Sequence, residues 1–318
     1  MLKYFIFRFL MIVPMLLLVA VIIFTGLQFT PGDPLTYMIP PELLSSSDFD
    51  LEAYKKAMGL DAPVYIQFLR WFGGLLTGQL GYSLVDGSDI AKMISNRLPA
   101  TFELALSALI VSSVLGILLG LLSSIKQNSA ADYGNTIIGV LGISIPEFFV
   151  GIIAIQVFAI SLGWLPVGGR IGYGDVTFFD RVEYLIMPAL VLGFSLTAAL
   201  MRYTRGTMLD VLGKDYVKTA RSKGLPEWKV VTKHAFRNAL MPVVLLLVFR
   251  LPLLLGGTVI IESVFGWPGM GEMLLNAVSA SDYPVVMICT MLVAMMVLFA
   301  SFLVDLLTAM LDPRVRFE

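Results

Sequence analysis

Four polar residues, Glu147, Gln156, Arg250 and Asp305, lie inside apolar stretches of this sequence that are long enough to cross a membrane. A charged side chain at membrane depth is costly and usually has a function. Arg250 and Asp305 have opposite charges, which predicts either an ion pair or a transport pathway in which Arg250 receives a substrate carboxylate. A third interpretation places the Arg250 guanidinium at the membrane surface or against another subunit. Glu147 follows Pro146, which predicts a kink; there Glu147 and Gln156 either face the pore or bond to a neighbouring helix.

Enzyme chemistry is not supported by the remaining reactive residues. The run Gly193-Phe194-Ser195 weakly resembles a serine nucleophile turn, but His234, the only histidine, lies in a basic loop and cannot act as its base. A single histidine also excludes the paired ligands of a His-x3-His metal site. Cys289 has no second cysteine to bond with, and the chain contains no Gly-x4-Gly-Lys-Ser/Thr phosphate loop. We therefore expect no catalytic residue, no metal and no nucleotide bound by this chain.

Composition points to a protein surrounded by lipid. Of 318 residues, 58% are hydrophobic and only 14% are charged, and the net charge is -1. Water-soluble domains carry about 25% charged residues, and a chain without a positive field is not built for nucleic acid. Hydropathy predicts an all-α polytopic membrane protein with six transmembrane helices. Their ranges are 9–30, 102–124, 135–162, 184–202, 239–262 and 284–310.

Positive charge assigns the two sides of the membrane. Lys and Arg gather at both termini and in two of the short loops, and cytoplasmic loops carry such an excess. The residues concerned are Lys3, Arg8, Lys126, Arg202, Arg205, Lys214, Lys218, Arg221, Lys223, Lys229, Lys233, Arg237, Arg314 and Arg316. The opposite short loops hold only Arg170 and Arg181. We expect both termini and the loop 203–238 in the cytoplasm, and the segments 31–101, 163–183 and 263–283 outside.

A single membrane domain, 1–318, is the simplest organisation, because no repeat or low-complexity linker divides the chain. The first span is expected to be retained, since its apolar core exceeds the roughly 7–15 residues of a signal peptide. The outward segment 31–101 contains two predicted short helices, Asp50–Met58 and Pro63–Thr77. Aromatic residues in the second predict a position at the membrane surface.

The cytoplasmic stretch 215–238 predicts a helix, a break and a second helix. Gly224 suits the left-handed position that closes a helix, and Pro226 suits the first turn of the next one. Tyr216, Ala220 and Trp228 alternate with Lys and Arg, a composition that fits docking into a protein groove. The alternative is a basic loop lying against lipid headgroups.

Several stretches resemble the transmembrane permease subunit of binding-protein-dependent ABC importers, in particular the dipeptide, oligopeptide and nickel group. The first is Thr219-Ala220-Arg221-Ser222-Lys223-Gly224, which matches the form that this group gives to the family's cytoplasmic loop. Three more are Pro31-Gly32-Asp33-Pro34, Arg97-Leu98-Pro99-Ala100-Thr101-Phe102-Glu103-Leu104 and Glu262-Ser263-Val264-Phe265-Gly266-Trp267-Pro268-Gly269-Met270-Gly271. The resemblance thus covers essentially the whole chain.

The resemblance implies a type I ABC importer permease fold in a prokaryotic inner membrane. It implies three kinds of protein partner: a second homologous permease, two cytoplasmic ABC ATPases that bind ATP and Mg, and an extracellular or periplasmic substrate-binding protein. It also implies a coupling element that seats in the ATPases. The residues expected to form this element are Tyr216, Lys218, Thr219, Ala220, Arg221, Gly224, Leu225, Pro226 and Trp228.

The substrate that the resemblance implies is a peptide. Nickel complexes, glutathione and oligosaccharides are alternatives from the same group. From the residues alone, a secondary ion-coupled transporter is the main competing class, because Arg250, Asp305 and Glu147 are able to couple ions. Such a transporter predicts an internal inverted repeat, and none is evident.

Overall fold

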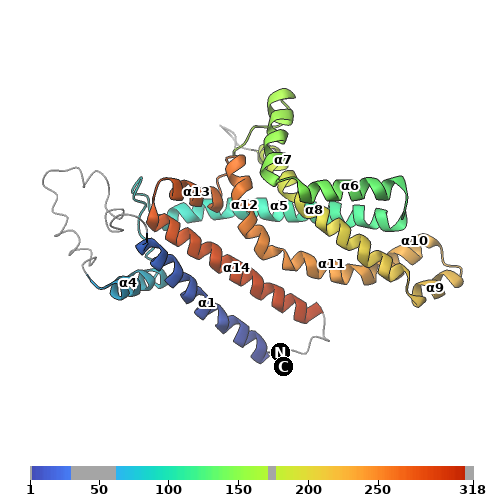
Figure 1. Cartoon of the computed structure of the whole chain (residues 1–318), viewed down its shortest axis with the longest axis horizontal. Helices are drawn as coiled ribbons and strands as arrows, with labels where there is room; N and C mark the ends of the chain where they lie inside the picture. The colour runs from blue at the N-terminus through green and yellow to red at the C-terminus, as the bar shows by residue number, and fades with distance from the viewer. Residues whose placement is uncertain (1, 30–61, 171–176, 312–318) are drawn as a thin grey trace. The chain divides into compact units, whose positions relative to one another are not determined.

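The computed structural model of the chain describes residues 2–29, 62–170 and 177–311 (Figure 1). Within these ranges the regular structure is helical; no β-strand occurs there, and Tyr82 and Asp89 form an isolated bridge. The helical elements are α1 (Leu2–Gln28), α4 (Val64–Leu76), α5 (Ile90–Ile125), α6 (Ala130–Ser144), α7 (Glu147–Ala154), the π-helical η2 (Ile155–Ser161), α8 (Phe178–Leu212), α9 (Asp215–Ser222), α10 (Glu227–Lys229), the π-helical η3 (Val230–Phe236), α11 (Arg237–Phe249), α12 (Leu251–Val264), α13 (Met270–Ser279) and α14 (Tyr283–Leu311). The predicted all-α fold class is confirmed.

Among the described residues, five helical runs are long and apolar enough to cross a membrane, and a sixth crossing is counted if the bent pair formed by 130–144 and 147–161 is one span. This agrees with six predicted spans, but the bounds differ. Helix α5 begins at Ile90 rather than near residue 102, and α8 continues to Leu212 rather than ending near 202. At 1.5 Å per residue these helices extend well beyond a hydrocarbon layer of about 30 Å.

Two predicted spans contain a break with a proline as its cause. Instead of one helix over 135–162, α6 and α7 meet at an angle of 104°, and Figure 1 shows α7 turning away from α6. Pro146 has no N–H to continue the helix, and Ile145 before it is extended, with φ -91° and ψ 126°. Likewise, the span 239–262 divides at Arg250 into α11 and α12, because Pro252 cannot donate to a carbonyl of the preceding turn.

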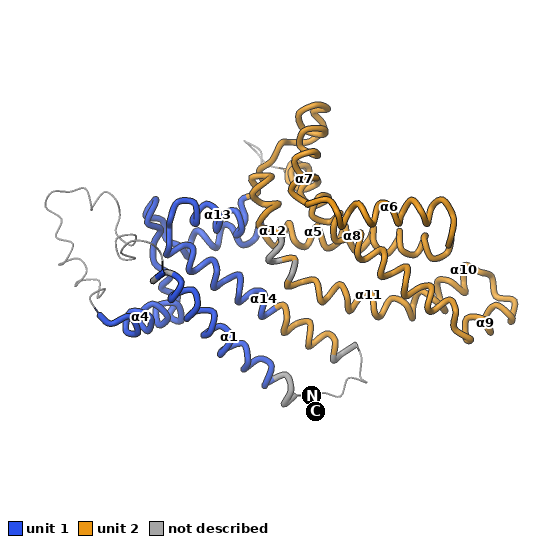
Figure 2. Tube along the Cα trace, in the orientation of Figure 1, with its two compact units in different colours: residues 1–100, 268–299 blue, residues 101–267, 300–318 orange. Residues whose placement is uncertain are grey.

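The chain divides into two compact units, residues 1–100 with 268–299 and residues 101–267 with 300–318 (Figure 2). In unit 1, α13 packs on the start of α5 and of α14. Its core consists of Ile90, Ile94, Met270, Met273, Ala277, Val285, Ile288 and Cys289. A smaller aromatic cluster joins α4 to α1, where Phe24 lies 5.5 Å from Phe68 and 5.8 Å from Trp71 between ring centroids.

Helix α4 confirms the predicted short helix 63–77, whereas the predicted helix 50–58 and the run 31–34 lie outside the described residues. Helix α13 is a further element of the segment 263–283. Gly269 precedes its first residue, so the Pro268–Gly271 run leads into a helix rather than forming only a turn.

Unit 2 is built around α8. Glycines on α5 and α6 allow close approach: a Cβ at Gly116 would lie 2.9 Å from Leu200, and a Cβ at Gly142 would lie 2.9 Å from Ala198. Small residues at helix contacts are typical of membrane bundles, where close packing replaces the hydrophobic effect between helices. Helix α8 is therefore the central helix of unit 2, against which α5 and α6 pack closely.

Candidate functional site

The predicted cytoplasmic loop 203–238 is mostly helical. Residues 203–212 are the end of α8, and residues 227–238 belong to the continuous run of α10, η3 and α11. Only 213–214 and 223–226 are not helical, and α9 lies between them. The loop is therefore a short helix held between two long ones.

The turn after α9 has the predicted left-handed glycine. Gly224 has φ +72°, and its N–H donates to the Arg221 carbonyl at 2.9 Å. Pro226 precedes α10 with φ -63° and ψ 141°, so it lies one residue before the helix rather than in its first turn. The predicted helix, break and second helix are confirmed.

One face of α9 is buried against its own bundle. Val217 and Ala220 are 0% and 6% exposed, three residues apart on the same face of the helix. They pack with Val230, Val211, Leu212 and Leu225. Ala220 and Leu225, which we predicted as coupling residues, thus pack α9 against the rest of its own bundle. An Ala220→Asp substitution would test the folding of this loop rather than a contact with a partner.

The opposite face of the loop is exposed and polar or aromatic. Trp228 is 65% exposed, and its recorded ring contact is with the Lys229 ammonium, 5.8 Å from the ring centroid. Tyr216 is 45% exposed and accepts a hydrogen bond from the Asn238 amide at 3.3 Å. The exposed Thr219 hydroxyl donates to the Asp215 carbonyl at 2.9 Å. An exposed indole and phenol on a short helical segment make a surface suited to another protein.

Two ion pairs brace the loop from outside. Lys218 pairs with Asp215 at 3.0 Å, and Arg221 pairs with Glu227 at 2.6 Å across the Gly224 turn. The second pair raises the pKa of Arg221 through the hydrogen bond to Glu227. Exposed pairs stabilise little. The Lys218–Asp215 pair lies within α9, and only the Arg221–Glu227 pair spans the turn.

Asp132 and Arg205 form an ion pair that sequence reasoning missed. The Arg205 Nε and Nη2 atoms donate to the two Asp132 carboxylate oxygens at 2.7 and 2.8 Å, and the Asn128 N–H donates to the same carboxylate at 3.0 Å. This bidentate pair ties the start of α6 to α8 near the loop. Arg205 had been counted only as part of a positive loop, and 73 residues separate the partners.

The four predicted membrane-depth residues lie in different environments. The Ser195 hydroxyl on α8 donates to the Glu147 carboxylate at 2.5 Å, and Arg250 donates to the Leu196 carbonyl at 3.4 Å. Within the described residues Arg250 makes no ion pair with Asp305, which is half-buried on α14. Gln156 is exposed in η2, and its backbone carbonyl accepts a hydrogen bond from the Ser161 hydroxyl. The structure thus brings Glu147 and Arg250 to consecutive residues of one helix.

Two of the stretches that carried the family resemblance contact each other. In unit 1, Arg97 pairs with Glu272, the residue directly after the second run. In unit 2, Thr101 donates to the fully buried Glu262 at 2.7 Å. A buried carboxylate is costly unless it is hydrogen-bonded, so these runs are matched to one another for packing.

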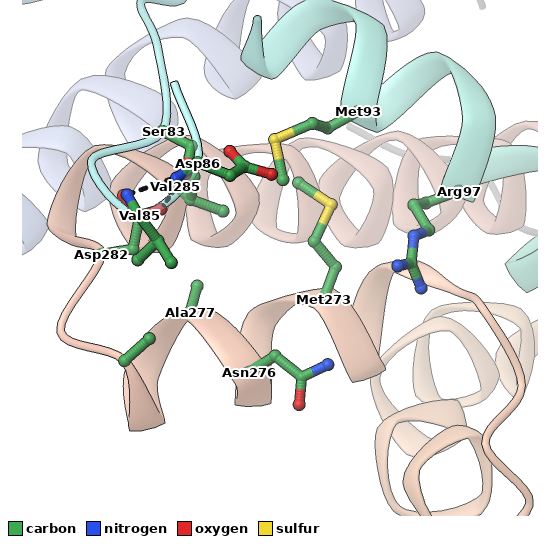
Figure 3. Close-up of a pocket in the computed structure, with 11 residues that line it drawn as sticks. Ser83, Val85, Asp86, Met93, Arg97, Met273, Asn276, Ala277, Asp282 and Val285 are labelled. Atoms are coloured by element: carbon green, nitrogen blue, oxygen red, sulfur yellow. Dashed lines mark hydrogen bonds between the residues drawn. The ribbon is translucent and has the colours of Figure 1, made fainter. Parts of the chain in front are cut away.

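Unit 1 contains a pocket of about 150 Å³ between α13, the start of α5 and the loop 82–89. Figure 3 shows Met93 and Met273 pointing toward each other across it, with Asp86 and Arg97 at its polar sides. The Ser88 N–H donates to Asp86 at 3.0 Å, which lowers the pKa of that carboxyl. Asp86 is therefore negatively charged at neutral pH.

Asp282 fastens the loop 82–89 to the segment before α14. It accepts a hydrogen bond from the Ser83 hydroxyl at 2.6 Å (Figure 3) and another from the Leu84 N–H at 3.2 Å. We expect Asp282→Ala to lower the thermal unfolding midpoint in detergent, because a buried hydroxyl without a partner costs about 1–3 kcal/mol. Ser83→Ala removes the same hydrogen bond and also the hydroxyl that accepts from the Val85 and Asp86 N–H groups at 3.2 and 3.3 Å. The double variant should therefore lose less stability than the sum of the two single variants. Additive losses would contradict a direct coupling.

The chain matches known proteins along nearly its whole length. The family described as binding-protein-dependent transport system inner membrane component matches residues 112–317, and the description for the N-terminal part of such membrane components matches residues 1–105. The chain belongs to this family. It is a multi-pass inner-membrane permease subunit of a prokaryotic ABC importer, in the peptide and nickel group.

Three relatives of the permease illustrate its group. An oligopeptide transport system permease protein of Bacillus subtilis is 39% identical over 316 residues, 99% of each chain. A di/tripeptide transport system permease protein of Pseudomonas aeruginosa is 37% identical over 97% of each chain. A glutathione transport system permease protein of Escherichia coli is 35% identical over 100% of each chain. The resemblance seen in the sequence is therefore confirmed, and the permease is a transport subunit rather than an enzyme.

Proposed function

We propose that this permease, paired with a second homologous permease, forms the pathway through which an ATP-driven importer moves peptides into the cell. Two cytoplasmic ATPases would bind ATP and Mg, and an extracellular or periplasmic protein would deliver the substrate. Peptide substrates are supported by the names of the oligopeptide and di/tripeptide relatives. The permease itself would bind no cofactor.

The buried and exposed side chains of α9 and α10 carry the proposal for coupling. Val217 and Ala220 anchor α9 on the bundle, while Tyr216 of α9 and Trp228 of α10 remain exposed. A rigid helix with an outward aromatic surface can be pushed as a unit by a partner that closes on ATP. Because α9 follows α8 after two residues, its movement would be passed to the helix at the centre of unit 2.

The topology assigned by positive charge fits this arrangement. It places the α9 loop and both termini in the cytoplasm, where ATP is available. Tyr216, Lys218, Thr219, Arg221 and Trp228 would then face the ATPase, with Gly224 and Pro226 shaping the turn.

Purification of the tagged permease from its own host in mild detergent tests the proposal. We expect a second six-span permease and one or two ATPases to copurify, and the complex to hydrolyse ATP. A homodimer without ATPase activity would contradict the proposal and favour an ion-coupled transporter.

The E. coli relative makes glutathione the second candidate substrate. Uptake of labelled tripeptide and labelled glutathione, compared in a strain with and without this permease, separates the two. Nickel complexes and oligosaccharides belong in the same assay as further substrates.

A further inference from the structure

Two broken membrane helices direct charged side chains to the same place on α8. Glu147 is the first residue of α7, directly after the Pro146 break, and Arg250 is the residue between α11 and α12. The first accepts a hydrogen bond from Ser195, and the second donates to the carbonyl of Leu196. Ser195 and Leu196 are consecutive, so their Cα atoms are about 3.8 Å apart.

Both charged groups have hydrogen-bonding capacity to spare. Arg250 has five N–H donors, and in the described part of the chain its side chain makes a single hydrogen bond, of 3.4 Å. Glu147 likewise has one recorded partner there, Ser195, on one of its two carboxylate oxygens. Unused charged groups at membrane depth are costly, so water or a ligand must occupy the space beside them.

The exposure of these residues indicates which surface they face. Glu147, Ser195 and Arg250 are all half-buried in the single chain. The exposed part of a carboxylate or guanidinium at this depth cannot face lipid tails at acceptable cost. It therefore faces a water-filled pathway, such as the one that a second permease would complete.

We propose that Glu147, Ser195 and Arg250 form a binding site within the pathway for the two charged ends of a short peptide. Arg250 receives the terminal carboxylate, and Glu147, oriented by Ser195, receives the terminal ammonium. This site rests on the proposed function, because it presupposes a peptide substrate.

The dimensions suit a short zwitterion. Through the 2.5 Å and 3.4 Å hydrogen bonds to adjacent residues of α8, the two charged groups lie within about 15 Å of each other. An extended peptide spans at most about 3.6 Å per residue, so a chain of no more than about four residues is long enough to bridge them. Guanidinium pairs with carboxylate in a bidentate manner, which makes arginine suited to a peptide terminus.

The test uses the complete importer in proteoliposomes, with labelled trialanine delivered by the binding protein. We expect Arg250→Gln and Glu147→Gln each to reduce uptake at least about tenfold, while copurification of the subunits and ATP hydrolysis without peptide stay within about twofold. Arg202→Gln is the matched control, because it removes an exposed arginine from α8, the helix that Glu147 and Arg250 both contact; its uptake should be unchanged.

Conservative variants separate recognition from folding. Arg250→Lys and Glu147→Asp keep the charge and should retain at least about a third of wild-type uptake. Wild-type uptake by either glutamine variant would overturn the site. Failure of the assembled Arg250→Lys and Glu147→Asp complexes to transport peptide would also overturn the site. So would a loss of assembly and ATP hydrolysis in parallel with uptake in the glutamine variants, because either result points to a structural role alone. If the wild-type complex hydrolyses ATP but takes up no peptide, the proposed function fails instead.

Discussion

Replacing Trp228 by aspartate is expected to release the ATPases from the permease while the membrane bundle stays folded. The indole is 65% exposed and its recorded contact within the chain is with Lys229, so its loss removes almost nothing from the bundle. At protein interfaces a tryptophan anchor is often worth 2 kcal/mol or more, which corresponds to roughly 30-fold in affinity. An aspartate at position 228 would also have to be buried when the ATPase binds, and this adds a desolvation cost. ATPase copurification and ATP-driven uptake should both fall at least tenfold.

Trp164 provides the matched control for this experiment. It is 66% exposed in the same unit, with its ring 6.1 Å from Phe158, and the charge distribution assigns it to the outer side. Trp164→Asp should leave ATPase copurification unchanged. If Trp228→Asp retains its ATPases, or if both variants lose them equally, Trp228 is not part of the docking surface.

The second large effect is expected at Gly224, in a graded series. With φ +72° the position disfavours other residues, and its Cβ direction is open space, so strain rather than collision decides the outcome. Asparagine tolerates this conformation, so the Gly224→Asn variant should show normal uptake. Alanine in the left-handed conformation costs about 1–2 kcal/mol, so the Gly224→Ala variant should show intermediate uptake.

Gly224→Pro should reduce uptake more than tenfold. Proline fixes φ near -65° and lacks the N–H that donates to the Arg221 carbonyl. The turn between α9 and α10 would then be lost, and α9 would no longer follow the ATPase. Membrane insertion should persist because the turn lies outside the bundle. Uptake by the proline variant equal to that of wild type would refute a coupling role for the turn.

Both experiments depend on the same property of the segment 215–229, which is anchored to the bundle through Ala220 and exposes Trp228. The Ala220 face determines whether the loop is a rigid body, and the Trp228 face determines what that body contacts. Substitutions on the first face are expected to lower thermal stability, and substitutions on the second to lower ATPase association. Measuring both quantities for every loop variant separates the two roles.

Local features of the sequence were enough to predict much of this protein. Long apolar runs predicted the membrane class and six spans, because a bilayer permits little else than continuous helices of that length. Gly224 and Pro226 predicted the turn, because left-handed φ and a missing N–H are properties of single residues. The order of short motifs along the chain identified the family.

Tertiary structure alone decided which side chains meet. The Arg250 partner is Leu196 rather than Asp305, Asp132 pairs with Arg205, and Ala220 faces inward. Pro146 signalled the break before α7, but not the direction that the chain takes after it, and the break at Arg250 between α11 and α12 was not predicted. The physical reason is that hydropathy and backbone stereochemistry act over a few residues, whereas an ion pair or a buried face depends on how distant helices rotate and pack against each other.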